Sequence, residues 1–243
     1  MAGHSKWANI KHRKGAQDAK RGKIFTKIIK EITVSSRIGG ADIESNPRLR
    51  KAVENAKASN MPADNIERAI KKGAGTLEGV KYEEVTYEGY GPSGVAILLE
   101  VVTDNKNRSV SEIRHAFSKF GGNLAENGSV SWLFEKKGVI HLELLNLNED
   151  ELYEIALNFG TDEIDNKSGI YEIKTEPNIM MELCKLFMEK DFKIISSNIE
   201  MSPKNYHHPK NEDIQQISML LEVFENNDDV NNVYSNINFD FKH

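Results

Sequence analysis

The 243-residue chain contains a single cysteine, Cys184, which excludes an internal disulfide and a zinc site built from cysteines. It also lacks long hydrophobic runs: the longest, residues 95–99, ends at Glu100, so no segment is long enough to span a membrane. The basic N-terminus has no apolar stretch and therefore does not resemble a secretory signal. These absences predict a soluble protein of the reducing, cytoplasmic compartment.

Sequence signatures of catalysis and of cofactor binding are missing as well. No G-x-S-x-G motif is present, and no Gly-Lys-Ser/Thr follows the glycine-rich stretch 89–94, which we interpret as a hairpin turn. The histidines are scattered, and only His207 and His208 are adjacent. Cys184 falls on the apolar face of a predicted helix, which favours a place in the core. We therefore expect no metal, no cofactor and no small-molecule substrate, and a protein that is not an enzyme.

Charge is distributed unevenly along the chain, although the net charge is only −5. Residues 1–80 hold 17 Lys and Arg against 8 Asp and Glu, whereas the remainder holds 15 against 29. A basic end on an acidic body is typical of proteins that bind nucleic acid. A solvated basic surface without a ligand is the simpler alternative, and charge alone does not decide between the two.

The basic end begins with an arm, residues 1–15, which has no apolar periodicity and which we expect to be mobile when unbound. The first helix follows, because apolar residues recur at helical spacing from Ile24 to Ile32, and Gly39 and Gly40 end the pattern. Four lysines fall near the face opposite the apolar one: Lys20, Lys23, Lys27 and Lys30. The pattern therefore predicts a helix that packs inward and presents a cationic ridge outward.

Two more helices complete a predicted three-helix bundle over residues 1–79. The second helix begins at Asn46, an N-cap residue that a proline follows. The third begins at Pro62 and ends at Gly73. The second and third helices, joined by about four residues, resemble a helix-turn-helix in outline.

Beyond residue 79 the pattern changes to short strands and helices, which predicts an α+β fold. Residues 136–204 spell β-α-β-β-α-β, the order of the ferredoxin-like motif, and this motif is complete without its neighbours. The segment 80–135 offers a hairpin, a helix and a strand, and the segment 205–243 offers a helix and a final strand. We therefore predict a discontinuous second domain, also ferredoxin-like, made of 80–135 plus 205–243, with the domain 136–204 inserted into it.

Two features of this arrangement can be checked in a structure. The strands predicted at 95–102 and 231–239 must lie in one sheet, because they come from the two halves of the divided domain. The first half must also supply a third strand, which the apolar pattern places at 130–134.

The strongest candidate site is the basic segment at the N-terminus, where no acidic residue precedes Asp18. Cations neutralise phosphates and release counterions, and a flat aromatic ring can stack on an unpaired base. The predicted nucleic-acid-binding residues of the arm and first helix are Lys6, Trp7, Lys11, His12, Arg13, Lys14, Lys20, Arg21, Lys23, Lys27 and Lys30. Trp7 has an alternative role, since it could instead pin the arm to the bundle.

Further cations extend this candidate surface. The second helix adds Arg48, Arg50, Lys51 and Lys57 to the predicted nucleic-acid-binding residues. Lys71 and Lys72 end the third helix, where lysines also favour the helix dipole, so their role is ambiguous. Weaker candidates flank the start of a helix in the second domain: Lys106, Arg108 and Arg114.

Several stretches of the chain resemble the YebC/PmpR family, to which mitochondrial translational activators of cytochrome oxidase also belong. The most specific is AGHSKWANIKHRK at residues 2–14, followed by AQDAKRGKIFTK at 16–27. The others are NIERAI (65–70), YEGYGPSGV (87–95), TDNKNRS (103–109), NGSVSWLF (127–134) and DDVNNVYSN (228–236). The resemblance spans essentially the whole chain and is less tight near residues 200–215.

This resemblance implies a non-enzymatic cytoplasmic protein of three domains. Members are commonly described as probable DNA-binding transcriptional regulators, and others as ribosome-associated translation factors that relieve stalling at proline-rich stretches. The implied partner is therefore nucleic acid, either duplex DNA or ribosomal RNA, and not a membrane. A second hypothesis is a protein-interaction adaptor, which would keep its partner after deletion of residues 1–20. A third is an enzyme, which requires a polar cleft with a perturbed ionisable pair.

Overall fold

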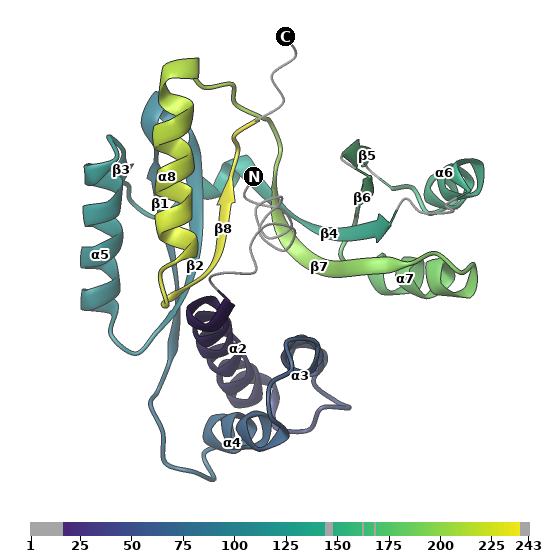
Figure 1. Cartoon of the computed structure of the whole chain (residues 1–243), viewed down its shortest axis with the longest axis horizontal. Helices are drawn as coiled ribbons and strands as arrows, with labels where there is room; N and C mark the ends of the chain where they lie inside the picture. The colour runs from purple at the N-terminus through teal and green to yellow at the C-terminus, as the bar shows by residue number, and fades with distance from the viewer. Residues whose placement is uncertain (1–16, 144–147, 162, 168, 239–243) are drawn as a thin grey trace. The chain divides into compact units, whose positions relative to one another are not determined.

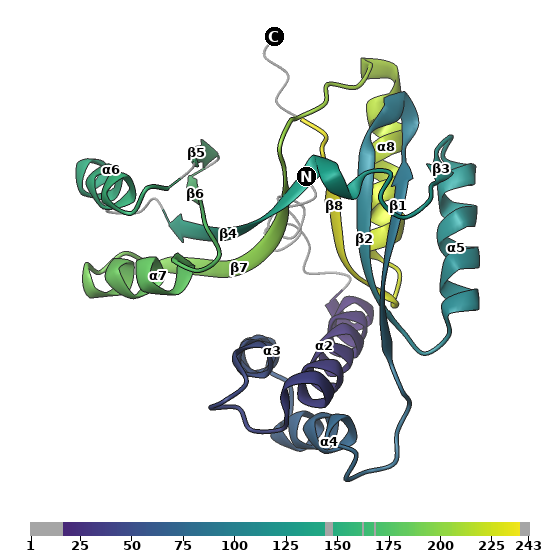
Figure 2. The same ribbon diagram turned by 180° about the vertical axis from the view of Figure 1, so that it is seen from behind.

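The computed structural model describes residues 17–143, 148–161, 163–167 and 169–238, and the side chains of residues 17–21 and 167 lie outside this description. The chain forms two compact units, one of residues 1–132 with 206–243 and the other of residues 133–205 (Figure 1, and Figure 2 from behind). Each unit contains helices and a four-stranded antiparallel sheet. The fold is therefore mixed α+β, as predicted.

Three helices form the N-terminal part of the first unit: α2 (Gln17–Gly39), α3 (Pro47–Ala58) and α4 (Ala63–Gly73). Asn46 caps α3, as predicted, and its side chain accepts a hydrogen bond from the Leu49 N–H (3.1 Å). The same side chain donates to the carbonyl oxygens of Ser35 (2.9 Å) and Gly40 (2.8 Å), so it also ties α3 to the end of α2. The small core of this bundle contains Ile32, Leu49, Val53, Ala56, Ile66 and Ala69.

Gly73 lies where α4 crosses α2, and the crossing leaves no room for a side chain. A Cβ added there would lie 2.3 Å from the carbonyl oxygen of Thr33. We expect Gly73→Ala to lower the free energy of unfolding by about 1–3 kcal/mol, because the two helices must separate. Gly22→Ala in α2, where a Cβ meets nothing within 4 Å, should raise it by about 1 kcal/mol. Urea denaturation compares the two variants, and equal shifts would contradict the close crossing.

A four-stranded antiparallel sheet forms the rest of the first unit, in the order β3 (Asn123–Leu124), β1 (Glu83–Tyr90), β2 (Ala96–Thr103) and β8 (Val230–Ser235). The helices α5 (Lys106–Lys119) and α8 (Ile214–Glu225) pack on one face of it. Alternate residues of β2, such as Ile97 and Leu99, enter the same core as Phe117 of α5 and Phe224 of α8. The two phenylalanine rings lie 4.8 Å apart between centroids, so both helices share one core with the sheet.

The strand β8 returns to this sheet from the far end of the chain. It pairs with β2, and Leu98 lies opposite Tyr234. The two strands that the inserted arrangement requires in one sheet are therefore neighbours. The finer division into domains 1–79, 80–135 plus 205–243, and 136–204 stays a prediction.

The strand predicted at 130–134 is wrong. Its residues form a short 3-10 helix (Ser131–Leu133), and β3 supplies the third strand instead. The buried carboxylate of Glu88 explains the difference, because it accepts hydrogen bonds from three backbone N–H groups of the loop 128–131, at 2.7–2.9 Å. Burial would raise the pKa of Glu88, but these donors hold the pKa below its ordinary value. The loop therefore gives its donors to a side chain and not to a sheet.

The second unit follows the predicted β-α-β-β-α-β order: β4 (Phe134–Glu143), α6 (Glu149–Asn158), β5 (Glu163–Lys167), β6 (Ile170–Thr175), α7 (Met180–Glu189) and β7 (Ile194–Pro203). Its strands are antiparallel in the order β5-β6-β4-β7. Cys184 is buried in its core, as predicted. The first unit has the different chain order β-β-α-β-α-β, so the expected ferredoxin-like connectivity is present in the second unit only.

Candidate nucleic-acid interface

The predicted nucleic-acid-binding residues of the arm lie outside the described part of the chain: Lys6, Trp7, Lys11, His12, Arg13 and Lys14. Lys20 and Arg21 belong to the start of α2, but their side chains are not described. The roles of all these residues therefore stay predictions.

Among the described lysines of α2, Lys23, Lys27 and Lys30 contact other parts of the first unit and do not form the free outward ridge that the sequence predicts. Lys23 Nζ donates to the carbonyl oxygen of Asn226 (3.0 Å), and Lys27 Nζ donates to that of Glu225 (2.7 Å). These carbonyls lie at the C-terminal end of α8, where helix carbonyls lack partners within the helix and carry negative partial charge. The sequence did not reveal these contacts, because helical periodicity separates a polar face from an apolar one but does not show what packs on the polar face.

Lys30 continues this row of lysines and is buried. Its Nζ lies 2.6 Å from an Asp229 carboxylate oxygen and donates to the carbonyl oxygens of Asp228 (2.9 Å) and Val102 (3.1 Å). The Lys30 side chain is 7% exposed and the Asp229 side chain is 6% exposed. All three ammonium donors therefore have acceptors within the protein, and in this arrangement Lys30 does not reach a phosphate, contrary to the prediction.

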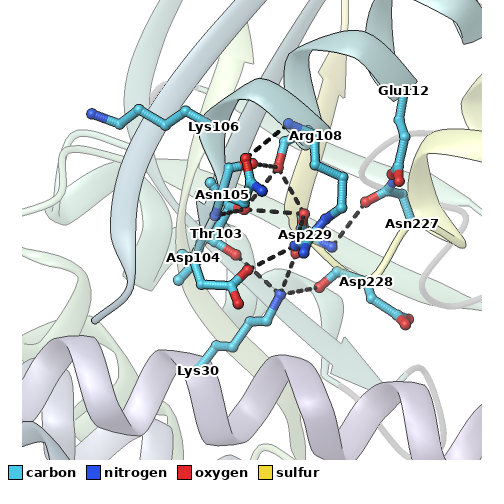
Figure 3. Close-up of polar contacts among 12 residues, drawn as sticks. Lys30, Thr103, Asp104, Asn105, Lys106, Arg108, Glu112, Asn227, Asp228 and Asp229 are labelled. Carbon is cyan, nitrogen blue, oxygen red and sulfur yellow. Dashed lines mark hydrogen bonds and ion pairs between the residues drawn. The ribbon is translucent and has the colours of Figure 1, made fainter. Parts of the chain in front are cut away.

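Asp229 is the centre of the polar cluster that Figure 3 shows. Its second carboxylate oxygen accepts hydrogen bonds from the hydroxyls of Thr103 (3.1 Å) and Ser109 (2.7 Å) and from the Arg108 guanidinium (2.8 Å). Burial would raise the pKa of Asp229, but Lys30, Arg108 and Ser109 outweigh it and hold the pKa far below its ordinary value. The cluster therefore contains a compensated buried charge that joins α2 to β2, α5 and the turn before β8.

Two of the weaker candidates in the α+β part of the first unit also form internal ion pairs. Arg108 lies between the carboxylates of Asp229 and Asp104, each at 2.8 Å, and hydrogen bonds to the two carboxylates raise the pKa of its guanidinium. Lys106 pairs with Glu83. Arg114 is exposed and has no ion-pair partner among the described residues.

Arg48 and Arg50 of α3 hold the fold together as well. Arg48 lies between Glu31 of α2 (2.7 Å) and Glu84 of β1 (2.6 Å), and Glu31 and Glu84 raise the pKa of its guanidinium. Arg50 donates to the carbonyl oxygens of Ile43 (3.2 Å) and Glu44. Both side chains thus have internal acceptors, which the sequence prediction did not anticipate.

A smaller set of bundle cations presents charge that no carboxylate of the described residues neutralises. Lys57 of α3 is exposed and Lys51 is half-buried, and neither has an ion-pair partner in the part of the chain that the structure describes. The same holds for the exposed Arg68 and Lys72 of α4. Lys71, in contrast, pairs with Glu67 at 2.6 Å.

A groove of about 990 Å³ runs alongside the C-terminal ends of α2 and α4. Three cations line it, Arg37, Lys72 and Lys81, against the single carboxylate of Glu78. Sequence reasoning missed Arg37 and Lys81 because each is isolated along the chain. The packing of α4 on α2 brings Arg37 to the same groove as Lys72, and the segment between α4 and β1 adds Lys81.

The described residues include no helix long and apolar enough to cross a membrane. The same residues hold no cluster of three or more His, Cys, Asp or Glu side chains placed to bind a metal ion.

Comparison with known families covers both parts of the chain. Residues 5–76 match the TACO1/YebC protein N-terminal domain, and residues 82–237 match the TACO1/YebC second and third domain. The chain belongs to the TACO1/YebC family.

Its YebC relatives match over nearly their whole length. A probable transcriptional regulatory protein of Koribacter versatilis is 53% identical over 99% of this chain and 96% of its own. One from Syntrophus aciditrophicus is 54% identical over 97% of this chain and 95% of its own. The crystal structure of a conserved hypothetical protein from Aquifex aeolicus superposes with a TM-score of 0.85 at 45% identity, over 96% of both chains. The curated names describe regulatory proteins and not enzymes.

The Lys30–Asp229 ion pair connects the two parts of the YebC chain that match separately, since Lys30 lies in the N-terminal match and Asp229 in the other. Sequence reasoning missed Asp229. A usable signal was the predicted pairing of β2 with the last strand, because this pairing brings residue 229 next to the end of β2. The Val102 N–H indeed donates to the carbonyl oxygen of Asp229 at 2.8 Å.

Proposed function

We propose that this YebC-family chain is a nucleic-acid-binding regulator of gene expression that acts on duplex DNA and catalyses no reaction. The observation that carries the proposal is the positive charge of the N-terminal part, 17 Lys and Arg against 8 Asp and Glu in residues 1–80. Exposed bundle cations such as Lys57 and Lys72, unpaired among the described residues, support it. The relatives' name, probable transcriptional regulatory protein, favours DNA as the target.

The cations divide into two groups with different roles in this proposal. Those of the arm and the start of α2 contact phosphates, and Lys51 and Lys57 extend this surface along α3. Trp7 stacks on a base where one is unpaired. Lys30 and Arg48 instead position the bundle against the sheet. Because phosphate contacts carry no sequence information, we expect binding through these residues to depend on salt more than on base sequence.

We expect Lys51→Ala combined with Lys57→Ala to weaken duplex binding. If both lysines contact phosphates, the slope of log K against log salt flattens by up to about 1.8, because each contact contributes about 0.9. Lys185→Ala is the control, because it removes a lysine of α7 whose side chain is 79% exposed. This variant should leave the slope unchanged. Fluorescence anisotropy of a labelled duplex over a range of salt measures both. An unchanged slope for the double variant would remove α3 from the interface.

Competition between duplex DNA and ribosomal RNA tests the proposed target. We expect a labelled duplex to stay bound at about 150 mM salt when ribosomal RNA is added at equal nucleotide concentration. Co-sedimentation with ribosomes together with weak duplex binding would assign the chain to translation instead, through shape-based contacts with RNA. Binding to neither, with protein partners kept after deletion of residues 1–20, would identify an adaptor.

A further inference from the structure

Lys23, Lys27 and Lys30 occupy positions i, i+4 and i+7 of α2, so they form one row along the helix. The whole row meets the end of α8 and the residues after it, 225–229. Lys23 is exposed, Lys27 is half-buried and Lys30 is buried. The contact is therefore accessible to solvent at the Lys23 end and closed at the Lys30 end.

The surface that faces this row is negative. The last carbonyl groups of a helix together carry roughly half a negative charge. Four acidic residues also lie in the segment 222–229: Glu222, Glu225, Asp228 and Asp229. A phosphate backbone has the same chemistry, because it presents negatively charged oxygens that accept hydrogen bonds from lysine. The end of α8 and a nucleic-acid backbone are therefore alternative ligands for the same ammonium groups.

We propose that the end of α8 competes with nucleic acid for Lys23 and Lys27, and that binding of nucleic acid opens the contact between α2 and α8. This inference rests on the proposed function, because it needs a polyanion at the basic N-terminal segment. Lys20 and Arg21 lie within one turn of Lys23, so a backbone bound to them also reaches the lysine row. While the contact is closed, the exposed carboxylates of Glu222 and Asp228 repel that backbone. Nucleic acid thus binds the open form better, which is the condition for shifting the equilibrium towards it.

Lys30 has the opposite role to Lys23 and Lys27. Its ion pair with Asp229 stabilises the closed form, and its buried ammonium gives nothing to a polyanion. Lys30→Met removes a positive charge and is nevertheless expected to tighten duplex binding by about tenfold, because a larger fraction of the protein is then competent to bind. A lysine that contacts phosphate would show the reverse. Lys57→Met, which removes an exposed cation without such a contact, should weaken binding.

Distances between two spin labels report the opening directly. Ala58→Cys on α3 and Ser118→Cys on α5 are exposed positions on the two sides of the contact, and Cys184→Ala removes the native thiol. We expect one distance population in the free protein and a second, longer one when a short mixed-sequence duplex DNA is added. Lys30→Met should populate the longer distance without DNA. The double variant Lys30→Met/Asp229→Asn should do the same, and it leaves no unpaired charge at either position.

The outcomes separate this inference from the proposed function. Duplex binding with unchanged distances, together with weaker binding by Lys30→Met, would overturn the inference and leave the proposed function intact. Failure to bind both duplex DNA and ribosomal RNA at about 50 mM salt would overturn both. If Lys30→Met does not fold, the double variant decides, since short distances and unchanged affinity in that protein would overturn the inference.

Discussion

Asp229→Asn is expected to lower the free energy of unfolding by about 3–5 kcal/mol, the usual cost of removing one member of a buried ion pair. The Lys30 ammonium would keep its two carbonyl acceptors and lose the carboxylate at 2.6 Å. The Lys30 side chain is only 7% exposed, so water could not solvate the ammonium that has lost its carboxylate partner. Urea denaturation followed by circular dichroism measures the loss.

Asp104→Asn is the matched control, because Asp104 contacts Arg108 at the same 2.8 Å as Asp229 but has a 37% exposed side chain. Its loss should cost less than about 1 kcal/mol, as for other exposed ion pairs. Combining Asp229→Asn with Lys30→Met should restore most of the stability, since no buried charge is then left alone. If Asp229→Asn and Asp104→Asn lowered the free energy of unfolding equally, burial of the Lys30–Asp229 pair would make no additional contribution to stability.

The lowered pKa of Asp229 also predicts how this contribution depends on pH. Since the folded-state pKa lies below the unfolded value of about 3.9, the stabilisation is complete above that value and is lost as the pH falls through the folded pKa. The charged groups that face the carboxylate are Lys30 from α2 and Arg108 from α5. The difference in stability between wild type and Asp229→Asn should therefore stay constant from about pH 7 to pH 5 and shrink below about pH 4. If this difference already declined between about pH 7 and pH 6, its pH dependence would arise from the titration of another group.

Replacing four cations of the arm by glutamine should have the largest effect on nucleic-acid binding; they are Lys6, Lys11, Arg13 and Lys14. If all four contact phosphates, the slope of log K against log salt flattens by up to about 3.6. Raising the salt from about 50 to about 200 mM should then weaken the wild-type complex by about 150-fold more than the variant complex. Fluorescence anisotropy of a labelled duplex at several salt concentrations measures this difference.

A control with the same change in net charge separates local contacts from a general charge effect. It replaces four exposed lysines of the second unit by glutamine: Lys136, Lys185, Lys190 and Lys193. Because long-range attraction between exposed charges is screened in salt, this variant should keep the wild-type slope. If the slope of log K against log salt flattened equally in both variants, net charge would explain the binding and the arm would have no particular role.

Local signals in the sequence predicted most of the helices because helix ends depend on residues close in the chain. Asn46 caps α3 as predicted, and Asn148 caps α6, where its side chain accepts a hydrogen bond from the Glu151 N–H at 3.4 Å. The strand at 130–134 was mispredicted because its donors bind the carboxylate of Glu88, some 40 positions earlier. No local pattern reports such a bond.

The candidate site was harder to predict for the same physical reason. Lys30 and Lys57 both lie on polar helix faces, yet Lys30 is buried against Asp229 and Lys57 is exposed. The difference arises from residues 199 positions apart, which meet only because β8 joins the sheet beside β2. Charge composition therefore located the basic end of the chain but could not separate the cations that bind internally from those that face solvent.

Photo-crosslinking of the full chain in cells, followed by sequencing of the attached nucleic acid and mass spectrometry of the attached peptides, tests the proposed interface most directly. We predict DNA fragments linked to peptides from residues 6–21 and 51–57, and none linked to peptides from residues 133–205. Crosslinks confined to the second unit, or a protein recovered without nucleic acid, would contradict a basic N-terminal domain that binds phosphate backbones.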